Sequence, residues 1–165
     1  MKIKSLICVS VILLFILTGC NQKIVGSDGL IEKAREEINV SDADTIELTI
    51  AGESIIEDRH LFWFISGNQY QAHRYIPIEF VSLGDDEYRF VKEYQPVERA
   101  ADIFVLMWDY GYSVVVNNPE CNSIIIADSL GKPHTVTVDK LPFVYYYKGM
   151  PSEYSFFDKD GNTLD

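Results

Sequence analysis

From residue 45 onward, the chain is dominated by short apolar segments that are separated by turn-forming residues, and this pattern constrains the fold most. In the segment TIELTIA (45–51), apolar and polar residues alternate strictly, which is the period of a half-buried strand. The segment 60–75 is apolar on both faces before a turn at 66–68, as expected for a central strand that meets a hairpin. The sequence therefore predicts an antiparallel meander.

The same logic continues to the C-terminus. Residues 76–94 alternate on both sides of a turn at Gly84-Asp85-Asp86. The last third of the chain adds a final hairpin with its tip at 159–162, and before it the strand-like segments YSVVV, SIIIA, HTVTV and FVYYY.

Two segments have a different period and are predicted to be short helices. Over residues 29–39 the apolar side chains fall on one face, and Ser27 or Asp28 can cap the first turn. Over residues 97–109 the apolar side chains recur three and four positions apart, and Gly111 can end the helix. The predicted fold class is α+β, with a mainly antiparallel sheet and these two helices. The repeated order of helix then strands leaves a weak internal duplication open.

The N-terminus has the features of a secretory signal. Lys2 and Lys4 are followed by an apolar run, Leu6 to Leu17, that is interrupted only by Ser10 and is short for a membrane-spanning helix. The run ends in Leu17-Thr18-Gly19-Cys20.

This ending resembles the lipobox of bacterial lipoproteins. The resemblance covers only the first 20 residues, and it implies cleavage between Gly19 and Cys20 and a diacylglyceryl group on the Cys20 thiol. It also implies that the mature protein is held by lipid on the extracytoplasmic face of a bacterial cell membrane. Residues 1–19 are then the removed signal, 20–27 a lipidated N-terminus and short tether, and 28–165 a single domain. An uncleaved membrane-anchor helix is the alternative reading.

Charge limits the partners. Residues 1–19 hold two of the 14 Lys and Arg and none of the 25 Asp and Glu, so the mature chain has 12 basic residues against 25 acidic ones, a formal charge of −13. Such a body is repelled by an anionic membrane surface, and two or more acyl chains are needed to hold it there. The charge also argues against nucleic-acid binding, which requires clustered Lys and Arg.

Cysteine usage predicts a fold without disulfides. Cys8 lies in the signal, lipid occupies Cys20, and Cys121 is then left alone. The mature domain must be stabilised by its hydrophobic core, for which its length and the 47% hydrophobic content of the whole chain are sufficient. No cofactor is predicted.

Metal sites have weak support in the sequence. Asp158, Asp160 and Asn162 alternate as in a calcium loop, but the glycine is at the fourth position of the loop and no later Glu follows, so a hairpin tip is the better interpretation. The three histidines, which are His60, His73 and His134, have no zinc-ligand spacing.

Catalytic signatures are also weak. Cys121 could act as a nucleophile if a base such as His134 came within hydrogen-bonding distance, although its flanking sequence matches no cysteine-peptidase signature. A carboxylate pair is defined by separation in space, which the sequence does not give. We therefore predict no catalytic residue.

Aromatic residues are the remaining functional indication. Tyr145, Tyr146 and Tyr147 with Tyr154, and the segment 108–112, could present rings to a sugar or a peptide. In a strand, Tyr146 must face opposite to Tyr145 and Tyr147, so one side of this trio is expected to belong to the core.

Two classes of function remain. The first is a non-catalytic lipoprotein that binds a protein, peptide or glycan at the outer face of the membrane. The second is a small surface hydrolase whose site is built from carboxylates or Cys121. The absence of a catalytic signature favours the first class.

Overall fold

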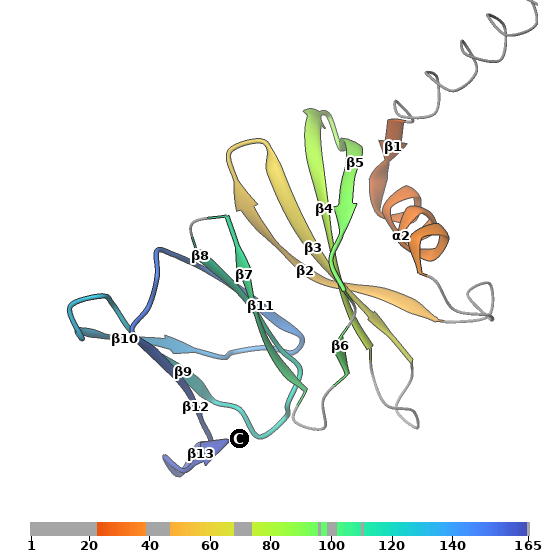
Figure 1. Ribbon diagram of the computed structural model, residues 1–165. Coiled ribbons are helices and arrows are strands. Elements are labelled where there is room, and N and C mark those ends of the chain that lie inside the picture. Colours follow the sequence, from red (N-terminus) through yellow and green to blue (C-terminus); the bar gives the residue numbers. More distant parts are fainter. Residues whose placement is uncertain are drawn as a thin grey trace, which may run out of the picture.

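The computed structural model describes residues 23–38, 47–67, 74–95, 97–98, 102–109 and 111–164. Most of these residues form antiparallel strands, which confirms the predicted mainly antiparallel sheet (Figure 1). The elements in chain order are β1 (Lys23–Val25), α2 (Gly26–Glu37), β2 (Leu48–Ile56), β3 (Arg59–Ser66), β4 (Arg74–Gly84), β5 (Glu87–Glu93), β6 (Val97–Glu98), β7 (Ile103–Trp108), β8 (Gly111–Val116), β9 (Ser123–Ala127), β10 (Pro133–Thr137), β11 (Phe143–Lys148), β12 (Glu153–Phe157) and β13 (Thr163–Leu164).

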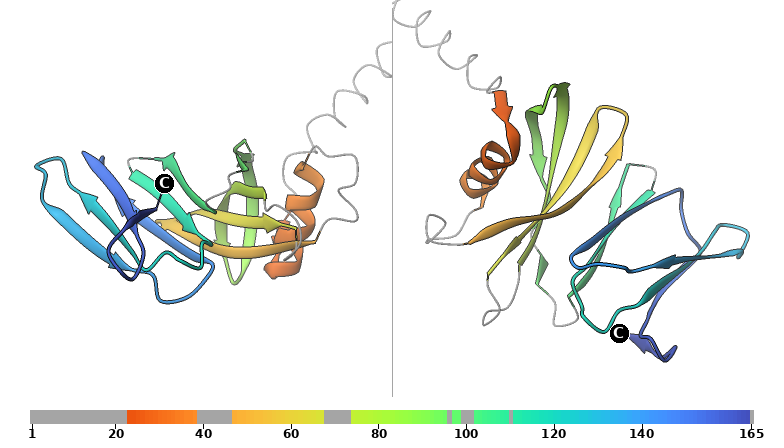
Figure 2. Two further views of the ribbon diagram at one scale, coloured as in Figure 1. Left: turned by 90° about the horizontal axis from the view of Figure 1, so that it is seen from below. Right: turned by 180° about the vertical axis from the view of Figure 1, so that it is seen from behind.

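The strands form three sheets. Sheet A has the order β1-β5-β4-β3-β2, with β6 paired to β4. Sheet B has the order β11-β8-β7, and sheet C has the order β10-β9-β12-β13. Together with α2 they lie in the sequence helix, sheet A, sheet B, sheet C, and the further views show the same succession of layers (Figure 2).

A hydrophobic cluster fills each space between successive layers. Between α2 and sheet A, Leu30, Ala34 and Ile38 pack against a set that includes Phe64 and Ile78. A second cluster lies between sheets A and B and contains Trp63, Ile65, Tyr75, Phe104 and Val115. A third cluster, between sheets B and C, contains Ile103, Val114, Val116, Cys121, Ile124, Ile126 and Phe156. Sheets A and B are therefore covered on both faces.

The first predicted helix is present with shifted ends. It spans Gly26–Glu37 rather than 29–39, and its buried face contains Leu30 and Ala34 as expected. The residue before the helix is Val25, which makes no side-chain cap, so the capping role expected of Ser27 or Asp28 is wrong. Instead, the first helical N–H, that of Gly26, donates to the Asp86 carbonyl (3.0 Å).

The second predicted helix, at 97–109, is wrong. The described residues of this segment form β6 and β7. The run Ile103–Trp108 is apolar at every position, so a strand buried on both faces fits it as well as a helix does. Phe104 enters the cluster between sheets A and B, while Ile103 enters the cluster between sheets B and C. The repeated order that suggested an internal duplication is lost with this helix.

The N-terminal residues are more ordered than a tether requires. Lys23–Val25, which the sequence analysis placed in the tether, pair with Glu87–Arg89 at the edge of sheet A. The first described strand, β1, therefore lies inside the segment predicted as the tether.

Candidate functional site

Three tyrosines in succession on β11 point to alternating sides of sheet B, as predicted. Tyr145 and Tyr147 pack against the cluster between sheets B and C. Tyr146 lies opposite Ser113 in the register and meets the Trp108 ring edge-on, with a centroid distance of 5.5 Å. The trio is thus divided between two environments.

Aromatic side chains gather at one end of the space between sheets B and C. The register places Met107, Tyr112 and Tyr147 side by side across β7, β8 and β11. From sheet C, the Tyr154 ring approaches Tyr112 and the His134 ring approaches Tyr147, each with a centroid distance of 6.3 Å. We call these five residues the aromatic rim.

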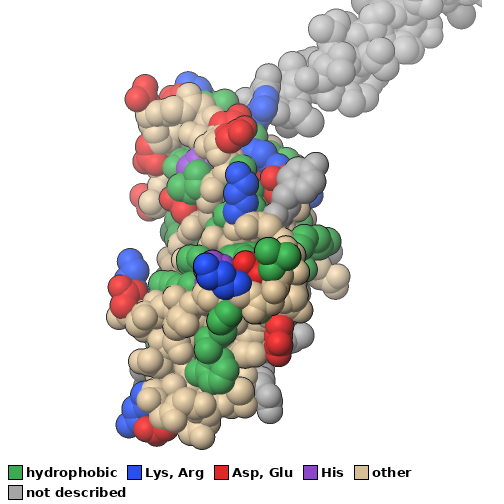
Figure 3. Space-filling view, turned by 90° about the vertical axis from the view of Figure 1, so that its left-hand side faces the viewer, with side chains coloured by type: hydrophobic (Ala, Val, Ile, Leu, Met, Phe, Trp, Pro, Cys, Tyr) green, Lys and Arg blue, Asp and Glu red, His purple; other side chains and the backbone are tan. Residues whose placement is uncertain are grey.

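Two residues of the aromatic rim are among the more exposed large hydrophobic side chains. Met107 is 59% exposed and Tyr154 is 45% exposed, while Tyr112 and Tyr147 are half-buried. Tyrosine combines a large contact area with a polar hydroxyl, which suits it to a recognition surface. On this side of the molecule, hydrophobic and uncharged groups lie beside a Lys or Arg, a His and an acidic side chain near the middle of the view (Figure 3).

The β9–β10 hairpin beside the aromatic rim is held by one carboxylate. Asp128 accepts backbone hydrogen bonds from Lys132 (2.9 Å) and Leu130 (2.8 Å), and these bonds keep its pKa below the usual value. The same carboxylate lies 3.7 Å from Nε2 of His134. Leu130, at the tip of this hairpin, is 91% exposed.

A buried carboxylate network supports the β7–β8 hairpin. Glu79 is 2% exposed, and its Oε1 accepts hydrogen bonds from Nε (2.8 Å) and Nη2 (2.6 Å) of Arg59. Its Oε2 accepts from the Tyr94 hydroxyl (2.8 Å) and from Nε1 of Trp108 (3.3 Å). The remaining guanidinium nitrogen of Arg59 donates to Asp109 (3.1 Å).

This network determines the ionisation of Glu79. Burial by itself would raise the pKa of this carboxyl, but the hydrogen bonds from Tyr94, Arg59 and Trp108, together with the Arg59 charge, outweigh it and hold the pKa below its usual value. Both oxygens are occupied by donors, so the group is suited to a structural role rather than to proton transfer.

The Glu79 network also helps to hold the β7–β8 hairpin, and with it two residues of the aromatic rim, in place. Trp108 lies between the Arg59 guanidinium, 5.5 Å from its ring, and the edge of Tyr146. At Gly111 a Cβ atom would lie 2.6 Å from the Tyr146 hydroxyl and would overlap the Tyr147 carbonyl oxygen, so this position needs glycine. The hairpin that carries Met107 and Tyr112 is therefore fixed against both β11 and sheet A.

The predicted nucleophile lies elsewhere and has no base. Cys121 is buried, burial raises the pKa of its thiol, and Sγ donates to the Ser123 carbonyl at 3.8 Å. His134 is paired with Ile126, five residues beyond Cys121 in sequence and thus about 16 Å along the strand. The structure does not bring the two together.

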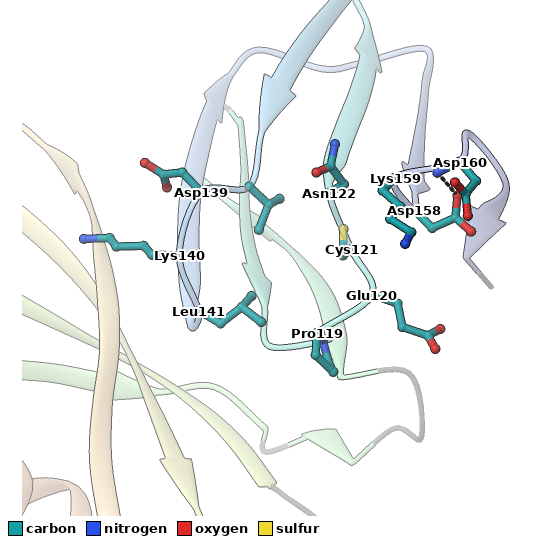
Figure 4. Close-up of a pocket in the computed structure, with 11 residues that line it drawn as sticks. Pro119, Glu120, Cys121, Asn122, Asp139, Lys140, Leu141, Asp158, Lys159 and Asp160 are labelled. Atoms are coloured by element: carbon teal, nitrogen blue, oxygen red, sulfur yellow. Dashed lines mark hydrogen bonds between the residues drawn. The ribbon is translucent and has the colours of Figure 1, made fainter.

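Cys121 lines a hollow of about 670 Å³ at the other end of the space between sheets B and C. The charged side chains stand at its margins, with Asp139 and Lys140 extending from one side and Asp158 and Asp160 belonging to the turn on the other (Figure 4). Leu141 and Cys121 lie between them.

The residues considered for metal binding are dispersed. His60 contacts Glu53 in sheet A (Nδ1 to Oε2, 2.5 Å), His134 is in sheet C, and His73 lies outside the described residues. Asp158 accepts hydrogen bonds from the N–H groups of Asp160 and Asn162, which is the chemistry of a hairpin tip. Within the part of the chain that the structure describes, no three His, Cys, Asp or Glu side chains are grouped so that they could hold a metal ion.

Comparisons with known proteins add no relative: no family model, curated protein or solved structure matches the chain. Among the described residues, no helix has the length and apolar character needed to cross a bilayer.

The sequence analysis named the tyrosines of the aromatic rim but did not predict that they lie together with Met107 and His134. Tyr112, Tyr147 and Tyr154 belonged to segments already considered, whereas Met107 and His134 were not linked to them. The Arg59–Glu79–Asp109 network was also missed, because its members are 20 and 50 residues from Arg59 in the chain. A glutamate in the otherwise apolar stretch 75–81 was the available signal.

Replacement of Glu79 by Gln tests the network. Glu79→Gln removes a buried charge and leaves Arg59 with Asp109 as its remaining carboxylate partner, so we expect the free energy of unfolding at pH 7 to fall by about 2 kcal/mol. Because the folded pKa of Glu79 is lowered, its contribution is complete above the usual Glu pKa and is lost as the pH falls toward the folded value. Stability of the variant should therefore depend less on pH in that acid range.

Urea unfolding as a function of pH measures both effects. Lys92→Gln is the matched control, since Lys92 is exposed and its Nζ lies 3.9 Å from Glu79, and it should change stability by less than about 0.5 kcal/mol. Equal stability of the two variants at every pH would show that the network does not stabilise the fold.

Proposed function

We propose that this protein is a lipoprotein, anchored through Cys20 at the extracytoplasmic face of a bacterial membrane, whose folded part is a non-catalytic binding module for a protein, peptide or glycan. The observation that carries the binding role is the aromatic rim, where rings from two sheets converge and Met107 and Tyr154 remain accessible. The anchor rests on the basic start, the apolar run and the Leu17-Thr18-Gly19-Cys20 sequence.

The start of the fold supports a close attachment to the membrane. Because β1 begins at Lys23, only Asn21 and Gln22 separate it from Cys20. Three residue steps span at most about 11 Å of extended chain. The edge of sheet A that contains β1 would therefore lie next to the membrane.

The succession of layers supports a partner on the other side. Sheets B and C lie on the side of sheet A opposite to α2 (Figure 1). Packed sheets are separated by about 10 Å, so the aromatic rim would stand on the order of 20 Å from sheet A. The aromatic rim is therefore separated by sheet layers from sheet A, whose edge strand β1 is close to the proposed anchor.

The hydrolase alternative has less support. Among the described residues the most buried carboxylate is that of Glu79, which has a lowered pKa and both oxygens occupied, whereas a general acid requires a raised pKa. The Cys121 thiol has a raised pKa, whereas a nucleophile requires a lowered one. The pKa shifts of Glu79 and Cys121 are therefore opposite to those that a general acid and a thiol nucleophile require.

Cys20→Ala tests the anchor. Without the lipid, a body of formal charge −13 should not adhere to an anionic membrane, so the protein should leave the membrane fraction or accumulate uncleaved. Cys8→Ala is the matched control and should leave anchoring unchanged, because Cys8 belongs to the removed segment. Cell fractionation and mass spectrometry of the N-terminus are the measurements. An unmodified Cys20 in the membrane-bound parent protein would contradict the proposal.

Tyr154→Ala and Tyr112→Ala test the binding surface. Ligands selected by the detergent-solubilised parent protein from a glycan array and a library of displayed decapeptides should bind at least tenfold more weakly to each variant, because each loses a ring of the aromatic rim. Leu83→Ala, an exposed apolar side chain at the end of β4, is the control and should bind as the parent does. Unchanged affinity of both tyrosine variants, with folding verified by circular dichroism, would reject the aromatic rim as the binding surface.

A further inference from the structure

Strand β7 is an apolar strand at the edge of sheet B. Among the described residues it pairs with β8 alone, in an unbroken register from Ile103↔Val116 to Trp108↔Gly111. Its sequence, IFVLMW, contains no charged residue and no proline. An edge of this kind presents unpaired backbone N–H and C=O groups that can pair with another strand.

The other described sheet edges carry features that discourage such pairing. Strands β1, β6 and β13 have three, two and two residues. Strand β2 is interrupted by an irregularity between Ile50 and Gly52, and there β11 packs so closely that a Cβ on Gly52 would lie 2.9 Å from Val144. Strand β10 begins with Pro133, and β11 ends with Lys148. Strand β7 has none of these features.

Acidic residues flank β7 at both ends. Asp102 and Asp109 both have positive φ angles, 52° and 53°, so the chain turns away at each end of the strand. Asp102 accepts a hydrogen bond from the Tyr75 hydroxyl (2.8 Å), and Asp109 accepts one from Arg59. Arg59 contacts both Asp109 and Glu79, so two carboxylates share one guanidinium at that end of β7. Together with Asp102 and the strong negative charge of the whole chain, this arrangement favours a partner strand with basic residues at its ends.

The same charges argue against a second copy of this chain as the occupant. If two β7 strands paired antiparallel along their full length, Asp102 of each copy would lie beside Asp109 of the other. Two bodies of the same negative sign would also have to approach each other. A partner segment with basic ends avoids both the contact between aspartates and the repulsion between two negatively charged bodies.

We propose that the free edge of β7 binds an extended, basic-ended segment of a protein partner, which adds to sheet B as a further strand. Backbone hydrogen bonds would supply affinity, and alternate side chains would supply specificity. Side chains on the face toward sheet C would lie beside Met107, which belongs to both β7 and the aromatic rim. The inference rests on the proposed function and narrows its ligand to an extended peptide.

A defined peptide tests the inference on the lipidated protein in detergent micelles. The probe has the sequence Lys-Thr-Val-Thr-Val-Thr-Val-Lys with blocked ends, and affinity is measured by fluorescence anisotropy. We expect bound probe to slow amide exchange in Ile103–Trp108 at least tenfold in hydrogen-exchange mass spectrometry. Two N-methylated versions of the probe are compared, each with alternate backbone N–H groups blocked, so that each version has lost the hydrogen-bond donors of one edge. The version that has lost the edge facing β7 should not bind, and the other should bind normally. Replacing both lysines by glutamates should weaken binding at least tenfold.

Matched methionine variants locate the site. Met107→Lys places a positive charge on the edge and should weaken binding of the probe at least tenfold. Met150→Lys makes the same change at a comparably exposed methionine (55%) outside β7 and should bind normally. Thermal melts verify that both variants are folded.

Failure of this inference is distinguishable from failure of the proposed function. If the probe does not bind, or binds without protecting β7, while ligands selected through the aromatic rim still depend on Tyr112 and Tyr154, the strand-addition inference is overturned and the binding module stands. If β7 becomes protected with rising protein concentration and sedimentation shows a dimer, the occupant is a second copy and the inference is again overturned.

Discussion

The packing of sheet A against sheet B is the contact on which the rest of the structure depends. Trp63, Phe104 and Val115 meet there with almost no exposure to solvent. The polar groups within this contact are paired: Nε1 of Trp63 donates to the Ser113 hydroxyl (2.7 Å), and Ser54 and Ser113 share a hydrogen bond of 2.7 Å. An unpaired polar group at such a place would cost about 1 to 3 kcal/mol. Among the described residues, no buried side-chain nitrogen or oxygen lacks a partner.

This contact also connects the two ends of the molecule that the proposed function uses. At one end, β1, which begins three residues after Cys20, lies at the edge of sheet A. At the other, the aromatic rim joins residues of sheets B and C. The Glu79 network lies between them, because Arg59 and Glu79 belong to sheet A while Trp108 belongs to sheet B. The position of the proposed binding surface relative to the membrane thus depends on how firmly the two sheets are joined.

Much of the fold could be predicted from local sequence, and the errors have a physical cause. The segment 123–127 and its neighbours were recognised as strands, and the opposite orientations of Tyr146 and Tyr147 followed from the period of a strand. The segment 103–108 was misread as a helix because burial on both faces removes the alternation by which a strand is recognised. The meeting of Tyr112 with Tyr154, and of Arg59 with Glu79 and Asp109, depends on how sheets pack and on hairpin register. Spacing along the chain does not encode these contacts.

Native-state hydrogen exchange tests most directly the claim that the layers form one cooperative body. The slowest amides of β3 in sheet A, β8 in sheet B and β9 in sheet C should exchange with a common free energy of opening, equal to that of global unfolding in urea. The layer packing predicts this result because sheets A and B each contribute side chains to two hydrophobic clusters, and sheet C shares one of these clusters with sheet B. If β9 and β8 opened at a cost more than about 2 kcal/mol below that of β3, the C-terminal strands would be a separate folding unit, and the claim of a single body would be contradicted.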